Sequence, residues 1–253
     1  RVDAESVNLQ LPSWDRVLSI LEAQGVKAGN WNSDAKEVVR VPQQLNTFLQ
    51  LRAVGIDEPV SNYTAMLDSL WNERVLKGGN GGGAAELATE IAELMAEKET
   101  LWLAGARFDN RTEDVGLLMS AGVLTRSEQG SVGFSHQTVF EHVLARGFAK
   151  NEGGLSTYVL ARTDSLFVRP KLWSALGYLR GVEPASYQAE LERIWREPGL
   201  RKHLRFLLLE FLGSQPKPTD REALLLAAAI KEEDLRPLVL KAITGSEGWF
   251  KRF

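Results

Sequence analysis

The sequence contains no cysteine, and this absence removes several classes of function at once. Without thiols the chain can form no disulfide and can carry out no thiolate chemistry. It also has no signal peptide and no apolar run of 18 or more residues, so we predict a cytoplasmic protein without a membrane partner. An initiator methionine is missing too. Because the chain begins at Arg1 and ends at Phe253, we expect it to be a fragment of a longer protein.

A large excess of charge of either sign is also missing. Lys and Arg number 30 against 33 Asp and Glu, which gives a net charge of -3 and a pI near 5.8. This balance provides no general attraction toward nucleic acid, and we predict no nucleic-acid partner. The chain does have 44% hydrophobic residues over 253 positions, which is enough for two or three small domains with cores of their own.

Residues 132–150, VGFSHQTVFEHVLARGFAK, carry the clearest local pattern. A short apolar strand ending at Phe134 runs into Ser135, a residue type that begins helices well. Apolar residues then recur at helical spacing, at Phe140, Val143, Leu144 and Phe148. The pattern predicts a strand that leads into an amphipathic helix. His136 falls in the expected first turn, where unpaired backbone N–H groups and the helix dipole favour an anion.

The run FSHQT (residues 134–138), followed by Glu141 and the small Ala145, resembles the winged-helix signature of NACHT-type STAND nucleotide-switch ATPases. In that family the corresponding histidine contacts the β-phosphate of bound ADP and holds the closed, resting state. The resemblance therefore implies that His136 is a nucleotide-binding residue. The alternative is a lone histidine that only caps or lines a helix start.

A zinc site on the same helix is a weaker interpretation. His136 and His142 are six residues apart, so at about 100° per residue they lie on different faces of one helix. Pairs that grip zinc on a helix are instead four residues apart. We therefore predict no metal site, and no catalytic residue, in this chain.

A second segment, VRVPQQLNTFLQL (residues 39–51), contains a proline where a helix should begin. It resembles the helical lid of the same family, in which such a proline packs on the adenine ring. The resemblance thus adds Pro42 to the nucleotide-binding residues. The stricter family motif has Gly two residues before the proline, whereas this chain has Arg40. The alternative is a proline that begins a helix for backbone reasons alone.

The glycine-rich run GGNGGG (residues 78–83) does not meet the requirements of a phosphate-binding loop. Such a loop follows a strand and continues into Gly-Lys-Ser/Thr at a helix start, whereas this run follows a helical pattern and leads into Ala84 and Ala85. We predict a flexible linker here. It would separate a helical lid at residues 1–80 from a winged-helix domain at 84–150.

Residues 84–150 show the order helix, helix, hairpin, helix that is typical of a winged helix. Apolar spacing predicts helices near 87–95 and 115–120, and a polar turn joins two short strands at 123–125 and 132–134. Many winged helices bind DNA. Here acidic residues crowd the first helix, at Glu86, Glu90, Glu93, Glu97 and Glu99. Phosphate would be repelled, so a DNA-binding regulator is the least favoured function.

The remaining part, residues 151–253, contains an internal repeat. Glycine recurs every 32 residues with a leucine five positions before it, at Gly181, Gly213 and Gly245 and at Leu176, Leu208 and Leu240. This period is near that of paired-helix solenoids and predicts HEAT-like helix pairs, with second helices at 187–196 and 221–230. A third unit would contain only one helix, so we expect a truncated array.

Together these patterns predict a mainly α protein that consists of a helical lid, a winged helix with a small β-hairpin and an α-solenoid of HEAT-like helix pairs. The resemblance implies a piece of a nucleotide-dependent signalling switch whose P-loop domain, which holds ATP or ADP with Mg, lies before Arg1. The isolated chain would then bind no cofactor and catalyse no reaction, although the full-length protein could be an ATPase. Its expected partners are that P-loop domain and either a protein ligand or a second copy, bound through the repeats. The alternative is an α-helical repeat scaffold for protein interaction that binds no nucleotide.

Overall fold

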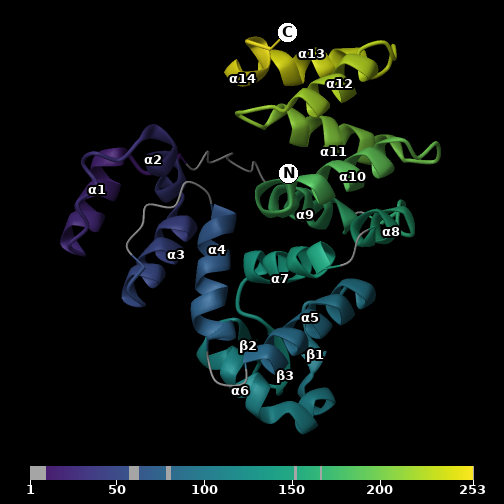
Figure 1. Ribbon diagram of the computed structural model, residues 1–253. Helices are drawn as coiled ribbons and strands as arrows, with labels where there is room; N and C mark the ends of the chain where they lie inside the picture. The colour runs from purple at the N-terminus through teal and green to yellow at the C-terminus, as the bar shows by residue number, and fades with distance from the viewer. Residues whose placement is uncertain (1–9, 57–62, 78–80, 151–152, 166, 253) are drawn as a thin grey trace, which may run out of the picture. The chain divides into compact units, whose positions relative to one another are not determined.

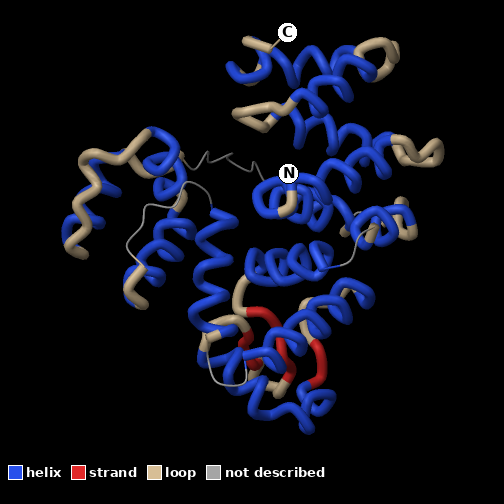
Figure 2. Tube along the Cα trace, viewed as in Figure 1, coloured by secondary structure: helices blue, strands red, loops and turns tan. Residues whose placement is uncertain are grey.

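The computed structural model describes residues 10–56, 63–77, 81–150, 153–165 and 167–252. The protein is 70% helical, and its described part holds a small three-stranded antiparallel sheet. Figure 1 shows the helices in chain order, and Figure 2 shows the three short strands among them. The prediction of a mainly α fold with a small hairpin is confirmed. No helix within these ranges is both long and apolar enough to cross a membrane.

The chain divides into two compact units that alternate along the sequence. Unit 1 comprises residues 1–87 and 106–125, and unit 2 comprises residues 88–105 and 126–253. This division does not test the predicted three parts at 1–80, 84–150 and 151–253, which stay a prediction.

Unit 1 begins with four α-helices that share one core. They are α1 (Trp14–Ala23), α2 (Ser33–Arg40), α3 (Pro42–Ala53) and α4 (Tyr63–Trp71), and a π-helical turn, η1 (Asn72–Leu76), follows α4 directly. Their apolar faces meet inside the unit at Val17, Leu21, Val39, Phe48 and Met66. Burial of these faces stabilises helices that are each short for independent existence.

Glycines end the first and third of these helices. Gly25 follows α1 with a φ of +76°, and Gly55 follows α3 with a φ of +84°. A side chain in that left-handed region clashes with the backbone, so glycine is the residue that closes a helix there at the lowest cost. Ser61, a residue type that caps helices well and from which we predict the start of the next helix, lies outside the described residues.

The glycine run differs from the prediction of a flexible linker. Residues 81–83 form the first turn of α5 (Gly81–Lys98), so the linker prediction is wrong for them, and residues 78–80 lie outside the described ranges. Ala84 and Leu87 follow at once and are buried, and Arg111 Nη2 donates a hydrogen bond to the Gly83 carbonyl at 2.8 Å. These contacts offset the cost of glycine in a helix, about 1 kcal/mol per residue.

The predicted hairpin is present. Strand β2 (Leu124–Arg126) turns at residues 127–130 into β3 (Ser131–Phe134), and β1 (Leu103–Ala104) completes the sheet in the order β1-β3-β2. β1 pairs antiparallel with β3, with Leu103 opposite Val132. A 3-10 segment, η2 (Gly105–Arg111), and α6 (Thr112–Ser120) precede the hairpin, and α7 (Gln137–Lys150) follows it. The element order expected of a winged helix is therefore observed from α5 to α7.

The helix pairs follow α7. They are formed by α8 (Gly154–Leu160), α9 (Val168–Val182), α10 (Pro184–Trp195), α11 (Lys202–Gly213), α12 (Asp220–Ala229), α13 (Arg236–Thr244) and α14 (Glu247–Phe250). Helix α7 packs on α9, α9 on α11, and α11 on α13, so the stack of first helices begins at α7 (Figure 1). The predicted third unit with a single helix is wrong, because the short α14 pairs with α13. It is held by Trp249, which is fully buried and donates from Nε1 to the Leu212 carbonyl at 2.7 Å.

A buried carboxylate connects two successive helix pairs. Glu222 in α12 has no exposed surface, and its oxygens accept from Arg180 Nε at 2.8 Å and from the Tyr187 hydroxyl at 2.6 Å. The Thr219 amide donates to the same carboxylate at 2.7 Å as part of a capping box. Burial by itself raises the pKa of Glu222, but these donors outweigh it and hold the pKa below its usual value. The carboxylate thus stays charged and fixes the register of α12 against α9 and α10.

Candidate functional site

The predicted phosphate-contacting segment lies in unit 2, where β3 leads into α7. Val132 of β3 is fully buried, and the Phe134 ring packs on Phe140 in the first turns of α7 with 5.5 Å between ring centroids. These apolar contacts fix both sides of the short connection at Ser135 and His136. The strand-to-helix junction predicted from the sequence is therefore present.

His136 caps α7. Its Nδ1 accepts a hydrogen bond from the Thr138 amide at 3.1 Å, and its carbonyl accepts from the Phe140 amide at 3.2 Å. The imidazole itself is exposed. Because Nδ1 is an acceptor here, the neutral ring carries its hydrogen on Nε2, which gives the exposed side of the ring a donor. The ring is thus held in one orientation at the start of a helix of 14 residues.

The structure corrects the predicted position of the cap. Ser135 is the residue type better suited to begin a helix, but α7 starts at Gln137, and it is His136 that accepts from the amide two residues further on. The imidazole nitrogen takes the place that a serine hydroxyl would occupy in the usual cap. His136 consequently lies just before the helix and not inside its first turn. At this position His136 can cap the helix, and its ring can also contact a phosphate, so both interpretations stay open.

Two other residues of the resemblance, Glu141 and Ala145, lie further along α7. Glu141 is partly buried and accepts from Gln137 Nε2 at 2.8 Å. Burial raises the pKa of its carboxyl, while the hydrogen bond from Gln137 and the nearby His136 lower it to a smaller extent. Ala145 is buried in the core that α7 shares with α9. The small residue thus serves the packing of α7.

His142 has a different environment from His136. Its ring is 5% exposed and meets the Tyr178 ring of α9 edge-on, with 5.4 Å between centroids. Burial, and then the positive charge of Arg146, lower its pKa to about 3. Since it is neutral and enclosed, His142 belongs to the α7–α9 interface and does not face a solvent-exposed ligand.

Pro42 lies in unit 1 as the first residue of α3, with Val41 as the N-cap. The pyrrolidine ring is exposed, whereas Leu45 and Phe48 of the same helix are buried. Arg40, which stands where the stricter family motif has glycine, donates from Nε to the Pro12 carbonyl at 2.9 Å. The backbone role of Pro42 is therefore evident, and its exposed ring has a surface that a planar base could cover.

The two predicted nucleotide-binding residues fall in different units. Pro42 belongs to unit 1 and His136 to unit 2, and each unit is described by itself. A joint contact of both residues with one nucleotide stays a prediction.

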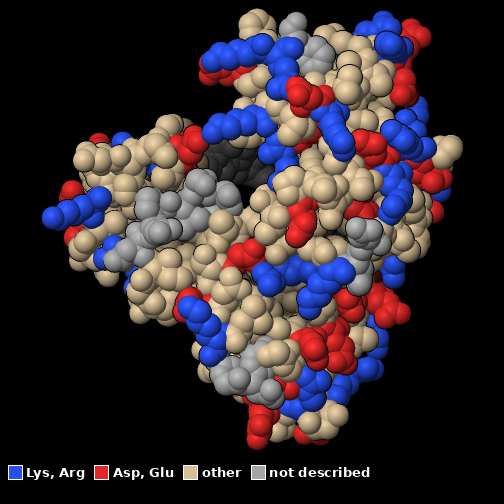
Figure 3. All heavy atoms as spheres, viewed as in Figure 1, with Lys and Arg blue, Asp and Glu red and all other residues tan. Residues whose placement is uncertain are grey.

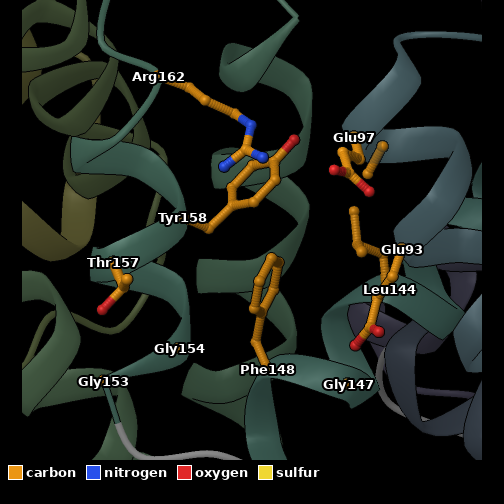
Figure 4. Close-up of a pocket in the computed structure, with 11 residues that line it drawn as sticks. Glu93, Glu97, Leu144, Gly147, Phe148, Gly153, Gly154, Thr157, Tyr158 and Arg162 are labelled. Atoms are coloured by element: carbon orange, nitrogen blue, oxygen red, sulfur yellow. The ribbon is translucent and has the colours of Figure 1, made fainter.

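A groove in unit 2, formed by α5, α7 and α8, has no motif in the sequence that would indicate it (Figure 4). In the sequence, Glu93 and Glu97 are two of several acidic residues on one helix, and Tyr158 and Arg162 belong to no recognisable motif. No motif could connect the pair Glu93 and Glu97 with the pair Tyr158 and Arg162, because the two pairs are more than 60 positions apart in the chain. The single local signal was the i, i+4 spacing within each pair, which places both members on one face of a helix.

Compared with known proteins, the chain matches no protein-family model, no curated protein and no solved structure.

Proposed function

We propose that this chain supplies the lid, the winged helix and the first repeats of a nucleotide-dependent switch of the NACHT-type STAND class, acting in the cytoplasm. The observation that carries the proposal is the geometry of His136. Its imidazole is exposed at the start of α7 and is oriented by the Thr138 amide, with Nε2 as a donor. In the family that the sequence resembles, a histidine at this place contacts the β-phosphate of ADP.

The proposed action of His136 is to bias a two-state equilibrium. A hydrogen bond from Nε2 to a phosphate oxygen contributes about 1 to 3 kcal/mol, since one partner is charged. If the contact exists only in the closed, ADP-bound state, its loss lowers the ratio of closed to open protein by about 5- to 150-fold. The P-loop domain, with ATP or ADP and Mg, would belong to the full-length protein before Arg1, and Pro42 would cover the adenine.

Two substitutions separate the phosphate contact from the helix cap. His136→Asn keeps a side-chain acceptor for the Thr138 amide, because asparagine is a strong N-cap, but its shorter side chain has no donor at the position of the imidazole Nε2. His136→Ala removes both. In the full-length protein we expect both variants to lose ADP faster and to form oligomers without a stimulus.

The measurements are retention of bound ADP after gel filtration and oligomer size, compared at equal folding stability. If His136 is only a cap, the asparagine variant should behave like the unsubstituted protein and the alanine variant should lose about 1 to 2 kcal/mol of stability. That outcome would refute the proposed switch function, and so would a full-length protein without a P-loop before Arg1.

A second candidate function is a helical-repeat scaffold for protein interaction. The observation that favours it is the buried Glu222 network, which fixes consecutive helix pairs against each other without any need for a nucleotide. A stiff stack of helix pairs offers an extended surface to a partner. The scaffold function would be favoured if the His136 variants still bound a protein partner after losing nucleotide. It would also be favoured if the full-length protein bound a protein partner but no nucleotide.

DNA binding remains the least favoured function. On the face drawn in Figure 3, the side chains of both charge signs are interspersed. A protein that binds nucleic acid through its phosphates would present a concentrated basic area instead.

A further inference from the structure

A groove of about 430 Å³ opens on the surface of unit 2. Helix α5 forms one wall, α7 forms the floor, and α8 with the turn after it forms the opposite wall (Figure 4). This volume lies in the range of small-molecule sites, about 300 to 1,000 Å³. Its chemistry is unusual for a simple packing defect, because charged side chains of opposite sign face each other across it.

Small residues of α5 and α7 leave space at the base of the groove. A Cβ added to Gly147 of α7 would lie 3.3 Å from Thr89 Cγ2 and 3.8 Å from a carboxylate oxygen of Glu93. A side chain at this position would therefore press on α5, and glycine lets α7 approach it closely. Ala96 of α5 is also part of the lining, and Phe148 rises from α7 in the middle of the groove (Figure 4).

The α5 wall is acidic and the α8 wall is basic. Glu93 and Glu97 are one helical turn apart and both are exposed, while the guanidinium of Arg162 stands on the other side (Figure 4). Within the described residues, none of these three side chains forms an ion pair. Among the described residues that line the groove, two carboxylates and one guanidinium are thus without an ion pair.

The basic wall is held rigid. The Arg162 guanidinium lies over the Tyr158 ring, 4.5 Å from its centroid, and that ring in turn packs on Phe148 at 5.4 Å. Lys171 holds the Tyr158 hydroxyl in place, because its Nζ donates to the phenol oxygen at 3.1 Å and to the Ala96 carbonyl at 3.4 Å. A ligand would therefore meet side chains that are already ordered, which lowers the entropic cost of binding.

We propose that this groove binds a basic α-amino acid, either free or as the C-terminal residue of a peptide. The ligand's carboxylate pairs with Arg162, whose planar guanidinium suits a carboxylate. Its cationic side-chain end faces Glu93 and Glu97, and its aliphatic chain crosses Phe148. One carboxylate meets one cation and the side-chain cation meets two carboxylates, so the charges of ligand and groove are complementary. The inference stands whether or not the protein is a nucleotide switch.

Three small ligands test each end of the proposed contact. We expect L-arginine to bind the 253-residue chain with a Kd below about 1 mM in calorimetry. Citrulline has the same shape without the side-chain charge, and agmatine lacks the carboxylate. Each should bind about tenfold more weakly or worse, because each loses a charge-assisted contact. A short peptide that ends in arginine, compared with its C-terminal amide, distinguishes a peptide from the free amino acid as the natural source.

Substitutions test the groove itself. Replacing Glu93 and Glu97 together by glutamine should abolish the preference for arginine over citrulline. Arg162→Gln should abolish the preference for arginine over agmatine. Glu90→Gln is the matched control, since Glu90 is an exposed glutamate of the same helix outside the groove lining. Circular dichroism would verify that each variant is folded.

The proposal fails if neither arginine nor the peptide shows saturable binding up to about 10 mM, a concentration about ten times the highest Kd that we expect. It fails equally if arginine binds no more tightly than citrulline or agmatine, or if the Glu93/Glu97 and Arg162 variants bind arginine as tightly as the wild type. Selective binding that the Glu90→Gln variant retains and the groove variants lose would support it.

Discussion

His142 should make the stability of unit 2 depend on pH in the weakly acidic range. The ring is buried against Tyr178, and its pKa is lowered from 6.5 to about 3, first by burial and then by Arg146. The folded protein therefore keeps this imidazole neutral where the unfolded chain protonates it. Because the unfolded state binds the extra proton, stability is full above pH 6.5 and falls as the pH decreases from 6.5 toward 3.

The magnitude follows from the two pKa values. At pH 5 an unfolded histidine of pKa 6.5 is almost fully protonated, whereas one of pKa about 3 is almost fully neutral. The linkage relation then gives a loss of about 2 kcal/mol between pH 8 and pH 5. The partly buried Glu141 acts in the opposite direction, since burial raises its pKa and its protonation favours the folded state. Its contribution is common to the wild type and to His142→Gln, so it cancels in that comparison.

Urea unfolding at pH 8, 6 and 5, followed by tryptophan fluorescence, measures this effect. Two compact units can unfold in two steps, and the step that depends on pH should be that of unit 2. In His142→Gln that dependence should be smaller by about 2 kcal/mol. His136→Gln is the control, because its ring is exposed. Equal pH dependence in the wild type and in His142→Gln, or its loss in His136→Gln, would refute the reasoning.

Three further predictions concern packing and binding. Glu222→Ala should lower the stability of unit 2 by about 3 to 5 kcal/mol in urea unfolding, because it leaves Arg180 and Tyr187 without their buried acceptor, and a loss below about 1 kcal/mol would contradict the network. Gly213→Ala should cost about 1 to 3 kcal/mol, since its Cβ would lie 2.7 Å from that of Ala242, whereas Gly181→Ala at the equivalent repeat position has open space and should cost nothing. The isolated chain should neither hydrolyse ATP nor bind ATP or ADP with micromolar affinity. Such an affinity requires about 8 kcal/mol of binding free energy, more than one ring contact at Pro42 and one hydrogen bond from His136 supply. Calorimetry that finds a micromolar Kd would contradict this prediction.

The sequence by itself determined the local elements of this protein. A proline at an expected helix start was enough to place α3, and apolar residues at helical spacing were enough to place α7. A polar turn between two short apolar runs placed the hairpin, and a period of 32 residues placed the helix pairs. These features depend on interactions between residues close in the chain, so their signal is present in the residue order.

Only the tertiary structure decided features that depend on contacts between distant segments. The glycines at 81–83 are helical because the residues after them are buried and Arg111 bonds the Gly83 carbonyl, which no local propensity indicates. Thr219 and Glu222 have the spacing of a local capping box, but only the fold brings Arg180, 42 residues earlier in the chain, to the Glu222 carboxylate. The groove is the clearest case, since Glu97 and Arg162 become neighbours across one hollow only after three helices pack. Packing joins residues by shape and charge in three dimensions, and that information is not written in any single stretch of the sequence.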